Sequence, residues 1–469
     1  MKLYSTLTKQ IDEIKPLNPP IVTVYTCGPT VYDYAHIGHW FTYVRMDTLI
    51  RALKADGLQP KWVMNITDVG HLVSDADEGE DKLEKGAKRE GKSAWEVAEF
   101  YTQDFIEGMK ALNMLQPDKM VKATDHIPDQ IELIKQLDDK GYAYIIDAGV
   151  YYDTSKFSRY GDFAGLDLDE QQAGARVSLN PQKRNASDFA LWKFSPTDHK
   201  RDMEWDSPWG KGFPGWHIDC SAMSMKYLGP TLDIHTGGID HVPVHHTNEI
   251  AQSEAATGKP FAQHWLHANH VMVEGQKISK SLSNGVSLQA TSDKGYSAEV
   301  VRLHVLESHY RSQSRFSWDS LEAAQNRLNN LQAFADLRFQ ATASDGKASG
   351  ADFDKYTELI TNALLDDLNT PKALALLSGL VDEHSVISRD ELGSFKRFIT
   401  SVDELLGTKL GKSEDISADQ RQLITKREAA RAIQDWQVSD NVRDQLGIQG
   451  VGLRDTPGGA IWFRQAPQK

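Results

Sequence analysis

The chain has 469 residues, of which 40% are hydrophobic and 25% charged, a balance typical of a globular protein with several domains. No run approaches the roughly 20 apolar residues that span a bilayer, and the first residues lack the apolar centre of a signal peptide. We therefore expect a cytoplasmic protein with no membrane partner. The formal net charge of −14 argues against a non-specific nucleic-acid coat protein, which would need clustered Lys and Arg.

The first predicted elements form a parallel βαβ unit. Residues 21–28 are β-branched and end at a glycine, which predicts a buried strand. Residues 38–56 carry apolar side chains at helical spacing and stop at Gly57, and residues 61–67 predict a second strand. Such a unit implies a parallel sheet with its ligand site at the carboxyl ends of the strands.

The rest of the chain divides by composition. Residues 117–194 show short mixed elements with Gly and Asp turns, as expected of an insertion between two halves of a sheet, and the sheet pattern resumes over 215–258. Beyond Trp318 the apolar residues follow helical spacing, which predicts a bundle, with a Gly- and Ser-rich connection at 341–352. Two short apolar runs around a turn predict a hairpin at the C-terminal end.

Two histidines mark the point where the first predicted strand gives way to the helix. His36 and His39 lie in the tetrapeptide HIGH, and a helix N-terminus offers free N–H groups and a partial positive charge. Imidazoles placed there can donate hydrogen bonds to a phosphate whose charge grows during transfer. A lone HxxH is also compatible with two surface or capping histidines.

A short basic loop follows the predicted strand in NHVMVEG. Lys277 and Lys280 lie three positions apart in KISKS, and such a loop can fold over a triphosphate. Alone it could be any exposed basic loop. Together with HIGH, it would give one parallel sheet two phosphate-binding segments from distant parts of the chain.

The two cysteines, Cys27 and Cys220, each lie among histidines and acids. In a reducing compartment they are better interpreted as ligands or core residues than as a disulfide. His245 and Glu249 have the i, i+4 spacing that places both on one helix face. Two thiolates, an imidazole and a carboxylate suit zinc.

Spacing alone leaves this ligand set open. His241 shares the helix face of His245, and His246 is its direct neighbour, so both are rival ligands. Two buried cysteines beside capping histidines are the alternative without a metal, since free cysteine is commonly buried.

Several motifs together resemble the cysteinyl-tRNA synthetases, a family of class I aminoacyl-tRNA synthetases. In chain order they are CGPTVYDYAHIGH, RNASDFALWK, PGWHIDCSAM, GGIDHVPVHHTNEIAQSEA, KISKSLSN and HYRSQ, and they cover most of the chain to about residue 320. The C-terminal part fits more loosely, through DDLNTPKAL and LRDTPGGAIW.

The resemblance implies an α/β fold: a Rossmann-like parallel-sheet catalytic domain with an inserted subdomain, then an α-helical bundle and a small C-terminal mixed α/β domain. The expected ranges are 1–116 and 206–258 for the two halves of the catalytic domain, 117–205 for the connective insertion, 259–317 for the lysine-loop and stem-contact region, 318–410 for the bundle and 411–469 for the anticodon-binding domain.

The resemblance also implies a role for each matching residue. The zinc ligands would be Cys27, Cys220, His245 and Glu249. The groups that handle the ATP phosphates, with Mg²⁺, would be His36, His39, Lys277 and Lys280, with Lys280 the better ATP contact. The ATP ribose would meet Asp240, and the amino-acid pocket would be lined by Thr67 and Trp216.

The implied reaction joins L-cysteine to the terminal adenosine of tRNA(Cys) through a cysteinyl-adenylate made from ATP. A shape-only pocket separates cysteine from serine by only about 1–3 kcal/mol, whereas zinc prefers sulfur to an aliphatic hydroxyl. We therefore expect the zinc, one per chain, to select the substrate thiolate. The tail would meet the anticodon, with Trp436 and Trp462 as candidate stacking residues or core residues. The family also suggests a monomer.

Several positions depart from the family pattern. The lysine loop has isoleucine in KISKS, Asp219 stands where glutamate is usual, and Thr247 stands where an acid is common. The segment from His235 to Gly238 replaces a run of three glycines. The stretch between Asp68 and Asp81 is longer than expected, which leaves the role of residues 69–85 open. These changes leave the expected ligands and lysines intact.

Two other functions remain open. A ligase that joins cysteine to an amino sugar would share the zinc, HIGH and lysine-loop features, but it would not need the long C-terminal extension. A catalytically silent zinc protein that binds RNA would not need an intact ATP-binding set such as His36 with Lys280.

Overall fold

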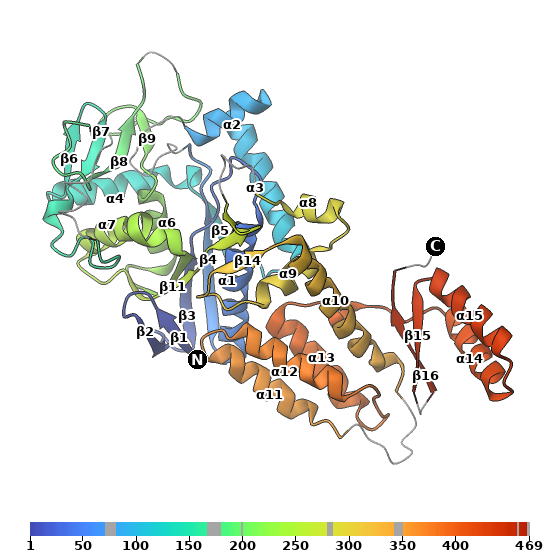
Figure 1. Cartoon of the computed structure of the whole chain (residues 1–469). Helices are drawn as coiled ribbons and strands as arrows, with labels where there is room; N and C mark the ends of the chain where they lie inside the picture. Colours follow the sequence, from blue (N-terminus) through green and yellow to red (C-terminus); the bar gives the residue numbers. More distant parts are fainter. Residues whose placement is uncertain are drawn as a thin grey trace. The chain divides into compact units, whose positions relative to one another are not determined.

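The computed structural model of the chain describes residues 1–70, 81–166, 180–197, 200–278, 285–341, 350–456 and 459–466. The chain divides into two compact units (Figure 1). Unit 1 comprises Met1–Ala290 with Tyr310–Arg315, and unit 2 comprises Thr291–His309 with Phe316–Lys469. Among the described helices, none is long and apolar enough to cross a membrane.

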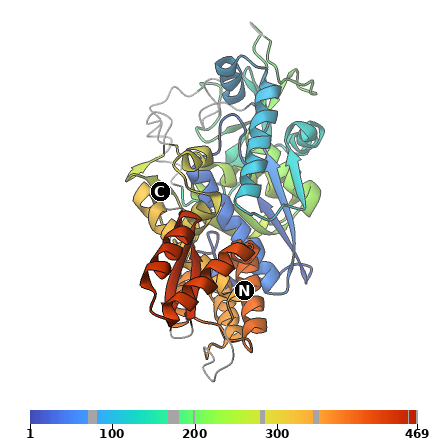
Figure 2. The same ribbon diagram turned by 90° about the vertical axis from the view of Figure 1, so that its right-hand side faces the viewer.

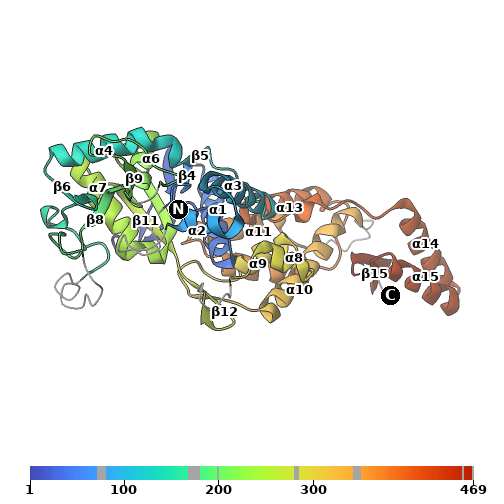
Figure 3. The same ribbon diagram turned by 90° about the horizontal axis from the view of Figure 1, so that it is seen from above.

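Unit 1 is built on a five-stranded parallel sheet. Its strands lie in the order β11-β10-β3-β4-β5. Their bounds are Ile21–Thr26 for β3, Gln59–Ile66 for β4, Lys119–Lys122 for β5, Leu232–Gly238 for β10 and Ala262–Ala268 for β11. The order runs outward in both directions from β3, so the crossover helices cover both faces of the sheet, as Figures 1 and 3 show.

Helices α1 (Ile37–Ala55) and α3 (Ala94–Ala111) follow β3 and β4, while α6 (Ile218–Leu228) and α7 (Thr247–Thr257) flank β10. The predicted βαβ unit and the parallel Rossmann-like sheet are confirmed. A single helix, α1, joins β3 to β4. The carboxyl ends of the sheet therefore bring Cys27, the HIGH segment and Thr67 to one edge, as the sequence predicts.

Two strands of this sheet lie outside the predicted halves of the catalytic domain. β5 falls in the range 117–205 and β11 in the range 259–317. β5 is short, and only its third residue is fully buried, so it carries little apolar signal. β11 contains Gln263, His264 and His267, which interrupt the apolar pattern of an otherwise buried strand.

The insertion between β5 and β10 is a second, antiparallel sheet. Its strands lie in the order β6-β7-β8-β9, with bounds Ala143–Ile146, Gly149–Tyr152, Phe189–Phe194 and Gly212–Pro214. Helix α4 (Ile127–Asp139) precedes it. The mixed, short elements predicted for this region are present.

Smaller elements complete the first unit, and two of them, α8 and β14, lie where the chain passes from one unit to the other. They are β1 (Lys2–Ser5), β2 (Gln10–Glu13), α2 (Lys82–Glu90), β12 (Val271–Val273), β13 (Gln276–Lys277), α8 (Leu288–Asp293) and β14 (Ser314–Phe316). β1 and β2 form an antiparallel hairpin. β12 and β13 form another, which leads into the lysine loop, as predicted for a loop that follows the strand in NHVMVEG.

Unit 2 is mainly helical, as the apolar spacing beyond Trp318 predicts. Its helices are α9 (Ala298–Leu306), α10 (Trp318–Ala335), α11 (Phe353–Leu365), α12 (Thr370–Glu383), α13 (Leu392–Leu406), α14 (Ala418–Ala432) and α15 (Trp436–Ile448), with short turns η6 (Asp336–Phe339) and η7 (Leu410–Lys412). The proposed connection at 341–352 lies largely outside the described residues.

The predicted C-terminal hairpin is β15 (Val451–Thr456) with β16 (Gly459–Arg464). α14 and α15 lie side by side next to it (Figures 2 and 3). Trp462 is buried in the core beneath the hairpin, with Val442 and Leu446 from α15. Trp436 is 55% exposed. For both tryptophans the sequence left open whether they are core or stacking residues. In the structure Trp462 is a core residue and Trp436 is a surface residue.

Candidate functional site

The two histidines of the HIGH segment cap helix α1. His36 is the N-cap residue: its Nδ1 lies 3.2 Å from the backbone N of Gly38 and accepts its hydrogen bond, and its backbone N donates to Nδ1 of His39 over 3.1 Å. The two rings stack with centroids 3.8 Å apart. Desolvation, together with His36 and His241, lowers the pKa of His39 to about 3. The His39 imidazole is thus neutral, and both rings line the positive end of α1, where an anion would be stabilised.

Both described ends of the lysine loop lie against this helix terminus. A Cβ atom on Gly38 would come within 3.0 Å of the side chain of Ile278, which precedes the loop. After the loop, Ile37 donates its backbone N–H to Val286 over 2.7 Å, and His36 pairs with Ser287. The backbone of Lys277 lies in β13, while its side chain and all of Lys280 lie outside the described residues. Ile278, Val286 and Ser287, which lie on the two sides of residues 279–284, are therefore close to the HIGH segment.

Both cysteines are buried at the carboxyl edge of the sheet. Cys27 follows β3, and Cys220 lies in the first turns of α6. Their sulfur atoms are 4.0 Å apart. Glu249 in α7 is fully buried, and Nε2 of His245 lies 3.7 Å from its Oε2. The ligand atoms of Cys27, Cys220, His245 and Glu249 all lie within 4.8 Å of one another, so the structure brings the whole predicted ligand set together.

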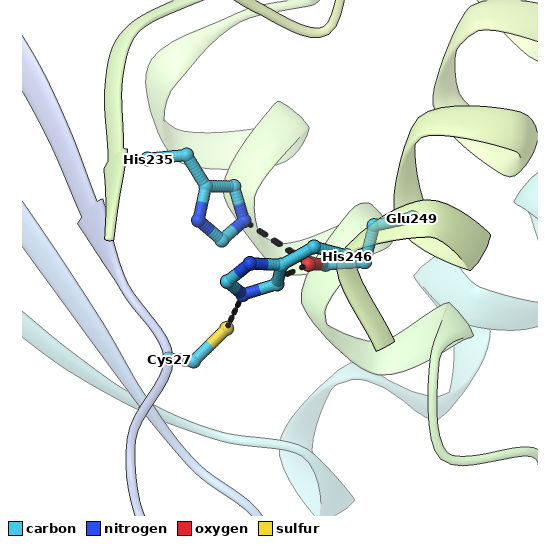
Figure 4. Close-up of side chains that lie close together, drawn as sticks. All are labelled: Cys27, His235, His246 and Glu249. Carbon is cyan, nitrogen blue, oxygen red and sulfur yellow. Dashed lines mark hydrogen bonds and ion pairs between the residues drawn. The ribbon is translucent and has the colours of Figure 1, made fainter. Parts of the chain in front are cut away.

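A second set of side chains overlaps the first. It replaces Cys220 and His245 with His235 and His246 around the same Cys27 and Glu249 (Figure 4). Nε2 of His235 lies 3.2 Å from Oε2 of Glu249, and Nε2 of His246 lies 3.3 Å from the sulfur of Cys27. His246, one of the rival ligands in the sequence, therefore remains a rival, and His235 joins it.

The way in which η4 (Val242–His246) ends accounts for the burial of both neighbouring histidines. This wide turn brings the hydroxyl of Thr247 to donate to the carbonyl of Val242, five residues earlier, over 2.8 Å. Such turns are frequent at functional sites. Gly237 on β10 leaves room for the rings, since a Cβ atom there would lie 2.7 Å from His246 and 2.8 Å from His241.

Further histidines surround the cluster. Nδ1 of His217 lies 2.9 Å from Nδ1 of His245, and Nδ1 of His246 lies 2.7 Å from Nε2 of His267 in β11. Sequence reasoning missed His217 and His267 and treated His235 only as a departure from the family pattern. The available signal was a histidine in each of two neighbouring strands, His235 in the middle of β10 and His267 near the carboxyl end of β11.

Burial shifts the pKa values of five groups in and around the cluster towards their uncharged forms. It raises the pKa of Cys27 to about 12 and that of Cys220 well above its usual value, and it also raises the pKa of Glu249. It lowers the pKa of His246 and His267 well below the usual value. A divalent cation reverses this preference for thiols, because metal coordination deprotonates them.

The donor set fits such a cation. Among the described residues, Nδ1 of His235 is buried and has no hydrogen-bond partner, while Oε2 of Glu249 has no hydrogen bond and only ion-pair contacts, of which the shortest is 3.2 Å to Nε2 of His235. Two sulfurs, an imidazole and a carboxylate within 4.8 Å match the ligand types and number of a four-coordinate zinc. The arrangement is therefore compatible with a metal site.

Thr67 lies between the two cysteine segments. The backbone N–H of Gly28 donates to Oδ1 of Asn65 over 2.8 Å, and Nδ2 of Asn65 donates to the hydroxyl of Thr67 over 2.9 Å. That hydroxyl donates to Oδ2 of Asp219, next to Cys220, over 3.2 Å. Thr67 is buried, so its hydroxyl belongs to the wall beside the cysteines.

Trp216 and Asp240 are the remaining residues expected at the amino-acid and ATP sites. The Trp216 ring is partly exposed, with its centroid 4.8 Å from that of His245. Asp240 is exposed in the turn η3 (Ile239–His241) that follows β10. Asp240 is thus at the carboxyl end of β10, and Trp216 lies beside the ring of His245.

Residues 13–326 match the family described as tRNA synthetases class I (C) catalytic domain. The fold is similar to that of Mycobacterium tuberculosis methionyl-tRNA synthetase bound by methionyl-adenylate, with a TM-score of 0.59 at 14% identity over 85% of this chain and 93% of the other. The parallel sheet with histidines at the start of α1 is therefore the catalytic domain of a class I tRNA synthetase.

The chain is also 46% identical to cysteine--tRNA ligase 1 of Burkholderia lata, over 99% of this chain and 97% of the other. It is 41% identical to the cysteine--tRNA ligase of Treponema denticola, over 98% of this chain and 99% of the other. The chain belongs to the cysteine--tRNA ligase family, as its motifs predict.

Proposed function

We propose that this protein uses ATP to activate L-cysteine and transfers the cysteinyl group to the 3′-terminal adenosine of tRNA(Cys). The similarity extends through the C-terminal unit as well as the catalytic domain. It gives no support to an amino-sugar ligase or to a catalytically silent zinc protein that binds RNA. The observation that carries the proposal is the placement of the cysteine cluster and the HIGH histidines at one edge of a class I sheet.

In the first step the cysteine carboxylate attacks the α-phosphate of ATP, and pyrophosphate leaves. We assign His36, His39, Lys277 and Lys280 to the phosphates, with Mg²⁺ bound with ATP. The contact of Ile278 with Gly38 supports this assignment, because it brings the loop to the helix terminus. Asp240 would hold the ATP ribose.

In the second step a ribose hydroxyl of the terminal adenosine attacks the carbonyl carbon of the adenylate, and AMP leaves. Orientation by the protein would supply much of the rate, because the two reactants are held together. For the amino-acid end, we assign Thr67 and Trp216 to the pocket wall. Both lie beside the cysteine cluster, which is where the substrate side chain would be recognised.

The residues that would hold zinc are Cys27, Cys220, His245 and Glu249. When bound there, zinc would offer a coordination position in which a thiolate is a much better ligand than an aliphatic hydroxyl. The contact between Nδ1 of His245 and His217 supports this set, since metal-binding histidines commonly use the other ring nitrogen for such a contact. His246 has contacts at both nitrogens, which favours an outer position.

The C-terminal domain would bind the anticodon. Trp436 is exposed, and the guanidinium of Arg431 lies over its ring at 5.6 Å. Exposed aromatic and Arg side chains stack on unpaired bases. We also propose that the protein acts as a monomer in the cytoplasm. Light scattering of the purified protein tests whether it is a monomer.

The experiment is ATP–pyrophosphate exchange followed by tRNA charging with the full-length protein. Cysteine should support exchange, serine should not, and tRNA(Cys) should become charged with cysteine. Exchange without charging would contradict tRNA as the acceptor. Absence of cysteine-dependent exchange in zinc-loaded protein would contradict the activity as a whole.

A further inference from the structure

A line of three close contacts connects the N-terminal hairpin to Cys27. The hydroxyl of Thr6 lies 2.7 Å from Nδ1 of His267, and Nε2 of His267 lies 2.7 Å from Nδ1 of His246. Nε2 of His246 lies 3.3 Å from the sulfur of Cys27. These four residues come from four separate segments, so only the folded chain assembles the line.

Thr6 is held in place without its hydroxyl. It directly follows β1, and its backbone N–H donates to the carbonyl of Trp265 in β11 over 2.9 Å. The hydroxyl of Ser5 accepts the backbone N–H of Trp265 over 3.3 Å. The hairpin is thus fixed to the strand that carries His267, and the Thr6 hydroxyl has a role that the backbone contacts do not require.

The hydroxyl can determine which nitrogen of each ring carries the proton. A neutral imidazole has one N–H donor and one acceptor nitrogen. If Thr6 donates to Nδ1 of His267, the proton of His267 is on Nε2 and is donated to His246. The proton of His246 is then also on Nε2, and it points at the sulfur of Cys27. A hydrogen bond of this kind stabilises a thiolate, the form that binds a metal.

We propose that Thr6 is a positioning residue of the metal site, whose hydroxyl fixes the ring of His246 against Cys27 through His267 and so strengthens zinc binding. The inference rests on the proposed function, because it concerns the same site. Partners beyond the direct ligands commonly change metal affinity by 10- to 100-fold. Loss of the hydroxyl would leave Nδ1 of His267, which is buried, without this partner.

The test compares Thr6→Val with Thr6→Ser in the full-length protein, with zinc affinity measured by competition with a chromophoric chelator. Valine keeps the shape of threonine and loses the hydroxyl, whereas serine keeps the hydroxyl. We expect about tenfold weaker zinc binding for Thr6→Val and near wild-type binding for Thr6→Ser. The KM for cysteine in pyrophosphate exchange should rise for Thr6→Val, while the KM for ATP should not change.

Thr8→Val is the matched control. Thr8 lies in the same hairpin, but its hydroxyl donates to Asp12 over 2.5 Å at the surface. This variant should bind zinc as the wild type does. If Thr6→Val does not fold, Thr6→Ala compared with Thr6→Ser isolates the same hydroxyl.

Zinc affinity of Thr6→Val within twofold of wild type would overturn the inference and leave the proposed function intact, provided that the wild type binds zinc and exchanges pyrophosphate with cysteine. Failure of the wild type to bind zinc would overturn both. Equal weakening by Thr6→Val and Thr6→Ser would also overturn the inference, since the hydroxyl would then not be the cause.

Discussion

Each unit buries a cluster of ionisable side chains, but only one cluster is satisfied by the protein itself. In unit 2, buried Asp336 accepts hydrogen bonds from Ser413 over 2.6 Å and from Gln332 over 2.9 Å, and it pairs with Arg464 over 2.8 Å. Arg338 also pairs with it over 3.2 Å. Within the described residues, no polar atom of Asp336 lacks a partner.

The cluster of unit 1 has the opposite character. Oε2 of Glu249 and Nδ1 of His235 have no hydrogen-bond partner among the described residues, and burial raises the pKa of Cys27 to about 12. An unsatisfied buried polar group costs about 1–3 kcal/mol, and a bound ion or ligand is one way in which this cost is offset. The Asp336 cluster is satisfied by the protein itself, whereas the cysteine cluster is compatible with a metal site.

The largest expected effect is the loss of the metal in Cys220→Ala. One thiolate ligand is removed from a four-ligand set, so zinc affinity should fall by more than 100-fold, beyond the usual effect of an outer partner. Cysteine-dependent exchange should fall with it. Metal analysis after dialysis and the exchange assay measure both.

The matched control is Ser224→Ala. Ser224 lies one turn further along α6 and is also fully buried, but its hydroxyl donates only to the carbonyl of Ser221 in the described contacts, over 3.2 Å. This variant should retain its metal. Metal content of Cys220→Ala equal to that of wild type would place the ligand set elsewhere, with the His235 and His246 set as the alternative.

The next effect concerns stability. Asp336→Asn should lower the free energy of unfolding by about 2 kcal/mol, because it removes the charge that faces Arg338 and Arg464. Pyrophosphate exchange should not change, since this network lies in unit 2. Glu322→Gln, at an exposed position of α10, should stay within about 0.5 kcal/mol of wild type in denaturant unfolding. Equal changes in the free energy of unfolding for the two variants would contradict a structural role for Asp336.

Trp436→Ala should raise the KM for tRNA(Cys) about tenfold, in line with about 1–3 kcal/mol for a stacked base. Trp436→Phe keeps an aromatic ring and should recover most of this loss. Exchange without tRNA should be the same in both variants. Unchanged charging kinetics for Trp436→Ala would leave this exposed ring without a role in binding tRNA.

The smallest effect is a dependence of stability on pH. The pKa of His39 is lowered to about 3 in the folded state and lies near 6.5 in the unfolded chain. The unfolded state therefore takes up a proton as pH falls below 6.5, and the folded state does not, so stability is lost between these values. At pH 5.5 the loss relative to pH 7.5 should be at most about 1.4 kcal/mol.

Denaturant unfolding of the wild type and of His39→Asn at both pH values measures the contribution of His39 to this pH dependence. The variant should lose less stability on acidification than the wild type does. An identical loss in the two proteins would mean that His39 is not held neutral by the fold.

Much of the site could be predicted from sequence because strand and helix periods fix the sheet edge. The βαβ unit brought Cys27 to the start of α1, and the i, i+4 spacing brought His245 and Glu249 to one side of the cluster. β5 and β11 were outside the predicted halves because their polar residues hide the strand pattern.

The choice among histidines could not be made from spacing. His235 and His267 come from neighbouring parallel strands, and their rings meet His246 only after the sheet has formed. The same limit applies to Trp436 and Trp462. Both are aromatic residues in a short domain, and only the packing of α15 on the hairpin makes one core and the other surface.

The central claim is that the cluster of unit 1 recognises the substrate through its sulfur. The most direct measurement is the absorption spectrum of the cobalt-substituted protein, because a thiolate bound to Co²⁺ gives an intense charge-transfer band that a hydroxyl does not. Addition of cysteine should increase this band above that of the two protein thiolates, and serine should leave it unchanged. A spectrum that does not respond to cysteine, in protein that still exchanges pyrophosphate, would contradict the account.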